Sequence, residues 1–253
     1  MTFALRNRQE LDSEQFAQML EHSPGKAAQA LLAAAGQDIV EAQLLLGQIL
    51  LDGRGIEKDP ALARRWFAIA ANRGSAMAHN MLGRCLEHGW GGDADVVRAA
   101  QHYRQAAQAG LDWGMYNLAN LLATGRGVVQ DHEGAFALYL QASDAGHAKS
   151  MNLLGRYLEQ GLVCRVDHVL ANQWYQRSAQ AGDFRGQFSY AGVLAEAGDI
   201  DGALYWLEQA LLAGNANFLR ASVPSLEQAM QPRLRAMAQP YAQRLAQLDG
   251  VHA

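Results

Sequence analysis

The sequence predicts an all-α fold, a right-handed α/α superhelix (solenoid) of about five helix-pair repeats with capping helices at both ends. Two observations predict it: apolar residues recur at helical spacing, and a glycine recurs at a nearly constant interval. These glycines, which end segments of the form Ala-x-x-Gly or close variants, are Gly74, Gly110, Gly146, Gly182 and Gly214, at separations of 36, 36, 36 and 32 residues. A repeat array can reach 253 residues as one continuous body, so the length does not require two domains.

Residues 1–36 precede the first repeat and are expected to form N-terminal capping helices. Asp12 with Gln15 has the residue types that start a helix, and so does Ser23 with Pro24. In the second pair the proline would occupy the first helical position, where its missing amide proton costs no hydrogen bond. We therefore expect two helix starts in this segment.

The first helix of each repeat carries an apolar face and one small residue. In the second repeat Ala78, Leu82 and Leu86 stand four residues apart, which places them on one side of a helix. A glycine or alanine follows the central apolar residue in every repeat, and its small side chain would allow the partner helix to approach closely. These small residues are Gly47, Gly83, Ala119, Gly155 and Ala191.

A turn and a second helix complete each repeat. Glycines such as Gly53 and Gly55 are expected to end the first helix, because glycine tolerates the left-handed backbone of a helix end. An aspartate then recurs at the position of a helix N-cap, at Asp59, Asp95, Asp131, Asp167 and Asp199. The predicted repeats cover residues 37–74, 75–110, 111–146, 147–182 and 183–214.

The last segment, residues 215–253, is expected to form a C-terminal helical cap. Ser225 and Gln228 have the spacing of a capping box, which predicts a helix start there. Pro232 and Pro240 are expected to restart or kink the helices that follow.

The complete pattern Ala-x-x-x-Leu-Gly, Gly-x-Gly, Asp, Ala, Trp, Ala-Ala-x-x-Gly resembles the Sel-one-like repeat family, a subfamily of tetratricopeptide-type repeats. The resemblance covers residues 37–214. Three repeats depart from it: the first carries two extra residues before Leu46, the fourth has Gly161-Leu162-Val163 where Gly-x-Gly is expected, and the fifth has a shorter turn at Gly198-Asp199. None of these departures changes a predicted core position.

Composition and charge narrow the function classes. The net charge of −4 offers no basic surface for phosphates, so nucleic acid is not expected as a partner. The first residues lack the apolar core of a signal peptide, and no apolar run reaches the roughly 20 residues of a membrane-spanning helix. Cys85 and Cys164 lie at different repeat positions, which argues against a disulfide. We therefore expect a cytoplasmic protein.

No motif predicts catalysis, a metal or a cofactor. The sequence has neither a P-loop motif nor a Gly-x-Ser-x-Gly elbow. The segment Gly89-Trp90-Gly91-Gly92 is the nearest approach to a phosphate loop, but it occupies the position of a repeat turn. Cys85, His88 and His102 could be imagined around a metal, yet no fourth ligand is apparent. The prediction is a protein without catalytic residues, metal or cofactor.

Equivalent positions on the first helices predict a binding surface. Stacked repeats align such positions as a ladder along a concave groove. The ladder positions are Leu44 and Gln48, Asn80 and Arg84, Tyr116 and Asn120, Asn152 and Arg156, and Phe188 and Gly192. The middle repeats carry polar side chains there. The resemblance to tetratricopeptide domains implies that they grip an extended peptide, with arginine forking onto carboxylates. The alternative is that some of them bridge adjacent repeats or only face solvent. The predicted partner-binding residues are Asn80, Arg84, Trp113, Tyr116, Asn120, Lys149, Asn152 and Arg156.

These features favour a non-enzymatic scaffold that holds a partner protein or extended peptide, as a monomer or weak homo-oligomer. Two other classes stay open. Apolar groove residues such as Leu44, Tyr116 and Phe188 leave self-assembly possible. An enzyme would require convergent titratable groups in one pocket of the groove.

Overall fold

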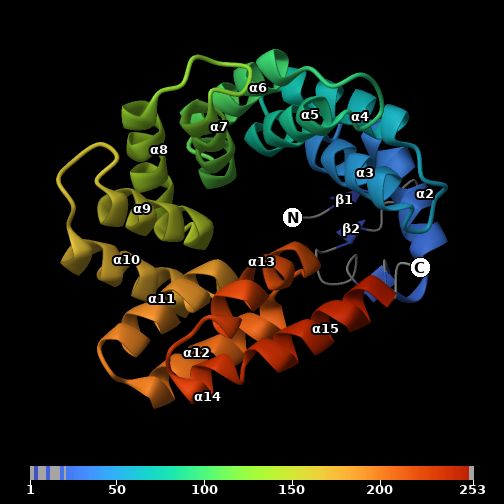
Figure 1. Ribbon diagram of the computed structural model, residues 1–253. Coiled ribbons are helices and arrows are strands. Elements are labelled where there is room, and N and C mark those ends of the chain that lie inside the picture. Colours follow the sequence, from blue (N-terminus) through green and yellow to red (C-terminus); the bar gives the residue numbers. More distant parts are fainter. Residues whose placement is uncertain (1–2, 5–9, 12–17, 20, 251–253) are drawn as a thin grey trace. The chain divides into compact units, whose positions relative to one another are not determined.

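The computed structural model describes residues 3–4, 10–11, 18–19 and 21–250, whose regular elements are helices apart from one pair of short strands (Figure 1). In this pair, β1 (Phe3–Ala4) runs antiparallel to β2 (Glu10–Leu11), and Phe3 lies opposite Leu11. The helices are α2 (Pro24–Ala35), α3 (Val40–Asp52), α4 (Pro60–Asn72), α5 (Ala76–His88), α6 (Val96–Gln108), α7 (Asp112–Thr124), α8 (His132–Asp144), α9 (Ala148–Gln160), α10 (His168–Gln180), α11 (Phe184–Glu196), α12 (Ile200–Ala213), α13 (Ala216–Glu227), α14 (Pro232–Arg235) and α15 (Ala238–Gly250).

The chain divides into two compact units, Met1–Asp131 and His132–Ala253. In the first unit each helix from α2 to α7 packs against the next along the chain, and in the second unit the same holds from α8 to α12. First helices of neighbouring repeats also touch, α5 with α7 and α9 with α11. This sequential packing of helix pairs confirms the predicted all-helical repeat fold, in which each repeat buries its apolar face against its neighbours.

The predicted caps set the bounds of the helices. Asp59, Asp95, Asp167 and Asp199 each accept a hydrogen bond from the amide three residues ahead, at 2.9–3.0 Å. The first helices of the first four repeats end at a glycine with a left-handed backbone. The aspartate and glycine registers of the sequence therefore correspond to real helix starts and ends.

Each Leu-Gly step receives an aromatic ring from the second helix of its own repeat. A Cβ atom built on Gly47, Gly83 or Gly155 would lie 2.5–2.6 Å from a ring carbon of Phe67, Tyr103 or Tyr175. Such a distance is far inside van der Waals contact, so only glycine fits beneath these rings. The predicted close approach of the two helices is confirmed at these three steps.

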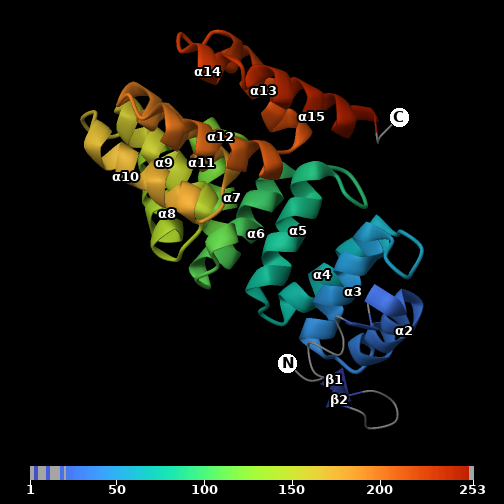
Figure 2. The same cartoon turned by 90° about the horizontal axis from the view of Figure 1, so that it is seen from below.

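The C-terminal segment packs on the fifth repeat of its own unit (Figure 2). Tyr241 is fully buried among α12 and α13 side chains, and its hydroxyl donates to the carbonyl of Leu207 at 2.8 Å. The helix start predicted at Ser225 is wrong: Asn215 caps α13, Ser225 lies inside that helix, and Gln228 ends it. The restart at Pro232 is confirmed as the first residue of α14.

At the N-terminal end, one predicted helix start is confirmed and one cannot be compared. Ser23 precedes α2 and Pro24 is its first residue. The start predicted at Asp12 and Gln15 lies outside the described residues. Over the stretches that the structure covers, no helix is long and apolar enough to cross a membrane.

Candidate partner-binding site

Two of the predicted binding residues are buried between repeats. Asn80 on α5 is 3% exposed, and its side-chain oxygen accepts a hydrogen bond from Nδ2 of Asn117 on α7 at 2.8 Å. Asn152 on α9 is 4% exposed and accepts one from Oγ of Ser189 on α11 at 3.0 Å. The prediction that these two asparagines face a partner is corrected, because buried side chains that bond to the next repeat act as bridges.

Arg84 lines a pocket of about 360 Å³ where the first and second repeats meet. Its guanidinium lies 5.0 Å from the centre of the Trp90 ring, and Nη1 lies 3.8 Å from the Met81 sulfur. Asp52, on α3, also lines this pocket, and both of its carboxylate oxygens accept from Nε2 of Gln48 at 3.0 Å. We call this the first junction pocket; Arg84 and Lys58 against Asp52 give it an excess of positive charge.

Arg156 lines a second pocket, of about 440 Å³, where the fourth and fifth repeats meet. Arg156 and Glu159 come from α9, and Glu196 comes from α11. The hydroxyl of Tyr175, on α10, donates to Oε2 of Glu159 at 2.9 Å. We call this the second junction pocket; two carboxylates against one guanidinium give it an excess of negative charge.

The two junction pockets occupy the same repeat register. Gln48 and Arg156, Pro60 and His168, and Arg84 and Gly192 are pairs of lining residues 108 residues apart, three repeats of 36. Each pocket therefore includes two positions of the predicted ladder, one from each repeat at its junction. The repeat geometry creates a pocket at this register, and the local side chains set its charge.

The remaining predicted residues lie outside these pockets. Trp113 is 38% exposed on α7 and meets Tyr116 edge to face, with ring centres 6.0 Å apart. Asn120 is half-buried on the same helix. Lys149, at the start of α9, is half-buried as well. The structure thus brings Trp113 and Tyr116 together, and neither of them lines the first junction pocket.

An apolar pocket of about 520 Å³ was not foreseen from the repeat pattern. Helices α11 to α14 line it, and its floor includes the buried residues Leu207, Leu226 and Leu234. Phe188, one of the apolar ladder residues, forms part of its wall. The sequence offers one signal for this pocket, since Phe188 is apolar at the position where Asn80 and Asn152 are polar. The residues that α13 and α14 contribute have no equivalent in the repeat.

His79 on α5 and His102 on α6 face each other with their Nδ1 atoms 3.1 Å apart. Burial lowers the pKa of both imidazoles. The nearby positive charges of His79 and Arg98 lower the pKa of His102 further. Cys85 is buried, and its thiol pKa is raised to about 11, chiefly by desolvation. Among the residues described, no three His, Cys, Asp or Glu side chains are grouped as a metal site would need.

The histidine pair predicts a loss of stability in mild acid. Because its folded-state pKa values lie below the model-peptide value of 6.5, the unfolded chain binds more protons as the pH falls through that value. The pair's contribution is complete above about pH 6.5 and declines below it. Urea unfolding should give a lower unfolding free energy at pH 5.5 than at pH 7.5, and His102→Gln should reduce the difference. An unchanged pH dependence in that variant would contradict the assignment.

Comparisons with known proteins agree with this architecture. The sequence profile described as Sel1 repeat matches residues 40–75, 76–111, 114–147, 148–183 and 186–215. A crystal structure of a Sel1 repeat protein from Oxalobacter formigenes superposes with a TM-score of 0.76 at 24% identity, covering 95% of this chain and 98% of that one. No curated protein matches the sequence significantly.

Two further solved structures show the same fold. The protective antigen c5321 of uropathogenic Escherichia coli matches with a TM-score of 0.69 at 25% identity, over 92% of this chain and 52% of its own length. The immunity protein Pa5087 from Pseudomonas aeruginosa matches with a TM-score of 0.56 at 14% identity, over 83% of this chain and 82% of its own. Since the five profile matches cover more than half of the sequence, the chain belongs to the Sel1 repeat family.

Proposed function

We propose that this protein is a non-enzymatic scaffold that holds segments of a partner protein at its repeat-junction pockets. Sel1 repeat folds typically act as protein-interaction scaffolds. The observation that carries the proposal is the pair of pockets in one repeat register, each lined by an arginine of the predicted ladder. Surface pockets with a few fixed polar groups among apolar ones are what an extended partner segment requires.

The two junction pockets carry opposite net charges and therefore favour different side chains of a partner segment. Arg84 and Arg156 form no ion pair with any described carboxylate, so both guanidinium groups can bond to a partner. At the first junction pocket, Arg84 and Lys58 favour an acidic side chain or a terminal carboxylate. At the second, Glu159 and Glu196 favour a basic side chain, while the Arg156 guanidinium can donate to carbonyl oxygens of the same segment. A partner segment would thus be recognised by charge as well as by shape.

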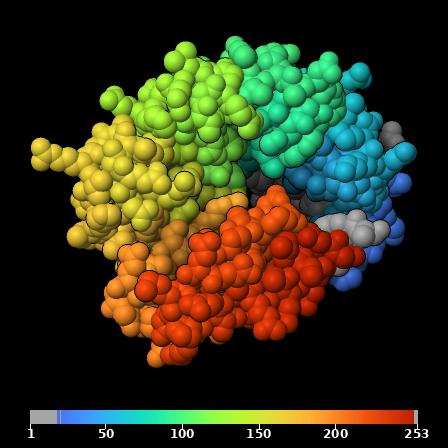
Figure 3. Space-filling view, viewed as in Figure 1, coloured from blue at the N-terminus to red at the C-terminus, as the bar shows by residue number. Residues whose placement is uncertain are grey.

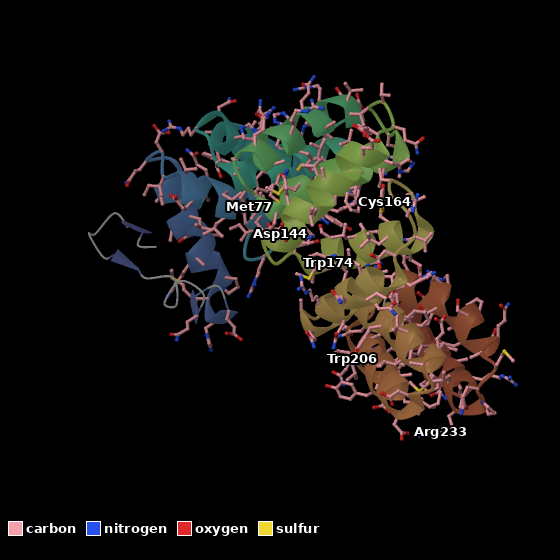
Figure 4. The ribbon with its side chains drawn as sticks, turned by 90° about the vertical axis from the view of Figure 1, so that its left-hand side faces the viewer. Met77, Asp144, Cys164, Trp174, Trp206 and Arg233 are labelled. Atoms are coloured by element: carbon pink, nitrogen blue, oxygen red, sulfur yellow. The ribbon has the colours of Figure 1, made fainter. Side chains whose placement is uncertain are left out.

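A cytoplasmic location is part of this proposal. Cys85 and Cys164 are both free thiols, and Cys164 is exposed in the turn between α9 and α10 (Figure 4). An exposed free thiol is best preserved in a reducing compartment, which supports the location.

The test is partner capture by an arginine variant. Arg84→Ala with Arg156→Ala should reduce the amount of partner recovered from the native cell about tenfold or more, because a charge-assisted hydrogen bond contributes about 1.5–3 kcal/mol. Quantitative mass spectrometry of proteins bound to the immobilised chain measures this loss.

The matched control is Arg65→Ala with Arg104→Ala. Both residues are exposed on second helices, α4 and α6, so the control removes the same charge from another surface. Its capture should equal that of the unaltered chain. Equal capture by the two double variants would show that the junction arginines do not bind the partner.

A further inference from the structure

We propose that the apolar pocket and the second junction pocket form one two-part site for a segment of a partner protein. The segment is extended and carries a large apolar side chain two positions from a lysine or arginine. This inference rests on the proposed function and names the chemistry that one of its sites recognises. Phe188, Gly192 and Glu196, all on α11, line both pockets and join them.

The apolar part of the site accepts a large side chain. Its volume of about 520 Å³ opens between α11 and the C-terminal helices, and Leu207, Leu226 and Leu234 form its floor. Met230 stands at its edge, 93% exposed, and Phe188 forms the wall next to the second junction pocket. Figure 3 shows the surface of the C-terminal helices that border it, coloured orange to red. An aromatic or leucine side chain would be removed from water there.

The charged part of the site lacks a positive charge that is present at the equivalent junction between the second and third repeats. In the second repeat, Glu87 accepts a hydrogen bond from Tyr103 and is also paired with Arg126 of the next repeat. Glu159 corresponds to Glu87 and accepts the equivalent hydrogen bond from Tyr175.

The residue corresponding to Arg126 in the fifth repeat is Gly198. Neither Glu159 nor Glu196 forms an ion pair with a described residue. A basic side chain of the bound protein would supply the positive charge that pairs with Glu159 and Glu196.

Gly192 keeps the two parts open to each other. It is exposed on α11, and a Cβ atom added there would meet no atom within 4 Å. Glycine weakens a helix relative to alanine, and nothing in the fold requires glycine at this position. The equivalent residues of the other repeats are Gln48, Arg84, Asn120 and Arg156, whose side chains would stand between the two pockets. The missing side chain permits a partner backbone to cross α11 closely.

The spacing favours an extended segment. A segment that crosses α11 at Gly192 passes over the helix backbone alone, and the Cα cylinder of a helix is about 5 Å across. Alternate side chains of an extended chain point to the same side at intervals of about 6–7 Å. An apolar side chain at one position and a basic one two positions later can therefore enter the two parts together.

Labelled octapeptides that differ at two positions test the site directly by fluorescence polarisation with the full chain. One carries Phe and Arg two positions apart in a Gly-Ser background, the second carries Phe and Glu, and the third carries Ala and Arg. We expect the Phe-Arg peptide to bind at least tenfold more tightly than either of the others. Glu159→Gln with Glu196→Gln should remove most of the preference for arginine over glutamate.

Two substitutions of one residue separate a blocked site from a damaged fold. Gly192→Trp should weaken binding of the Phe-Arg peptide at least tenfold by closing the passage across α11. Gly192→Ala should retain binding and raise the melting temperature by roughly 1–4 °C. Circular dichroism verifies that both variants are helical, and the glutamate variants provide the test if the tryptophan variant does not fold.

Equal affinity for the three peptides, or full binding by Gly192→Trp, would overturn the inference. A dimeric mass in light scattering that Gly192→Trp alone abolishes would also overturn it, because the occupant would then be a second copy of the chain. If these results fail while the Arg84 and Arg156 variant still loses its partner, the scaffold function stands and only this site is wrong. If the peptides bind as expected but partner capture does not depend on Arg84 and Arg156, the two-part site stands and the role proposed for the two arginines is wrong.

Discussion

Gly91→Ala should lower the free energy of unfolding by about 2–5 kcal/mol, because the new methyl group would collide with the backbone of another helix. A Cβ atom at Gly91 would lie 2.1 Å from the carbonyl oxygen of Pro60, at the start of α4. Gly91 also has a φ of +75°, which costs a non-glycine residue about 1–2 kcal/mol. Moving the backbone to relieve the collision adds about 1–3 kcal/mol.

Gly74→Ala is the matched control for this collision. Gly74 has a φ of +85°, but a Cβ atom there would meet no atom within 4 Å. The control should therefore cost only the backbone term, about 1–2 kcal/mol. Urea unfolding followed by circular dichroism measures both variants, and equal losses would show that the turn does not press on α4 as described.

The turn at Gly91 shows why the fold could be predicted from sequence. Its glycines recur at a fixed position between two apolar helices, so a structural role at each repeat explained them better than a phosphate loop. The aspartate register worked for the same reason, since Asp59 and Asp95 each accept from the amide three residues ahead. The backbone conformation at a helix end restricts the residue type directly, and its recurrence at a fixed spacing makes the pattern detectable in the sequence.

The candidate site could be predicted only in part, because side-chain burial depends on the rotation of each helix about its axis. The ladder positions Arg84 and Arg156 do line pockets. Asn80 and Asn152, four residues earlier on the same helices, are turned into the interface with the next repeat. Four residues are slightly more than one turn, so a rotation of about 40° about the helix axis separates a bridge from a pocket wall, and the sequence pattern does not fix rotation that finely.

The apolar pocket was beyond prediction for a different reason. Its floor includes Leu226 and Leu234, from helices that follow the repeat array and have no repeat register. The sequence signals in that segment were also misleading, since the capping-box spacing of Ser225 and Gln228 falls at the end of a helix. Packing of a non-repeating segment on the array depends on tertiary contacts that periodicity does not encode.

Removal of a single ring from the second repeat should have an effect as large as the Gly91 collision. Tyr103 is fully buried on α6, and its ring fills the space left by Gly83 on α5. Tyr103→Ala would remove that packing and leave a cavity, which costs about 3–5 kcal/mol for a buried aromatic residue. We expect the melting temperature to fall accordingly, as calorimetry can measure.

Tyr103→Phe separates the ring from its hydroxyl. The Tyr103 hydroxyl donates to Oε2 of Glu87 at 2.6 Å, and burial together with this bond raises the Tyr103 pKa above its usual value. Loss of the bond should cost about 1.5–3 kcal/mol, less than loss of the ring, because Glu87 keeps its pairing with Arg126. Tyr205→Ala, at an exposed position on α12, should change stability by less than about 0.5 kcal/mol. If Tyr103→Ala cost no more than Tyr205→Ala, the ring beneath the Leu-Gly step would not be a determinant of repeat stability.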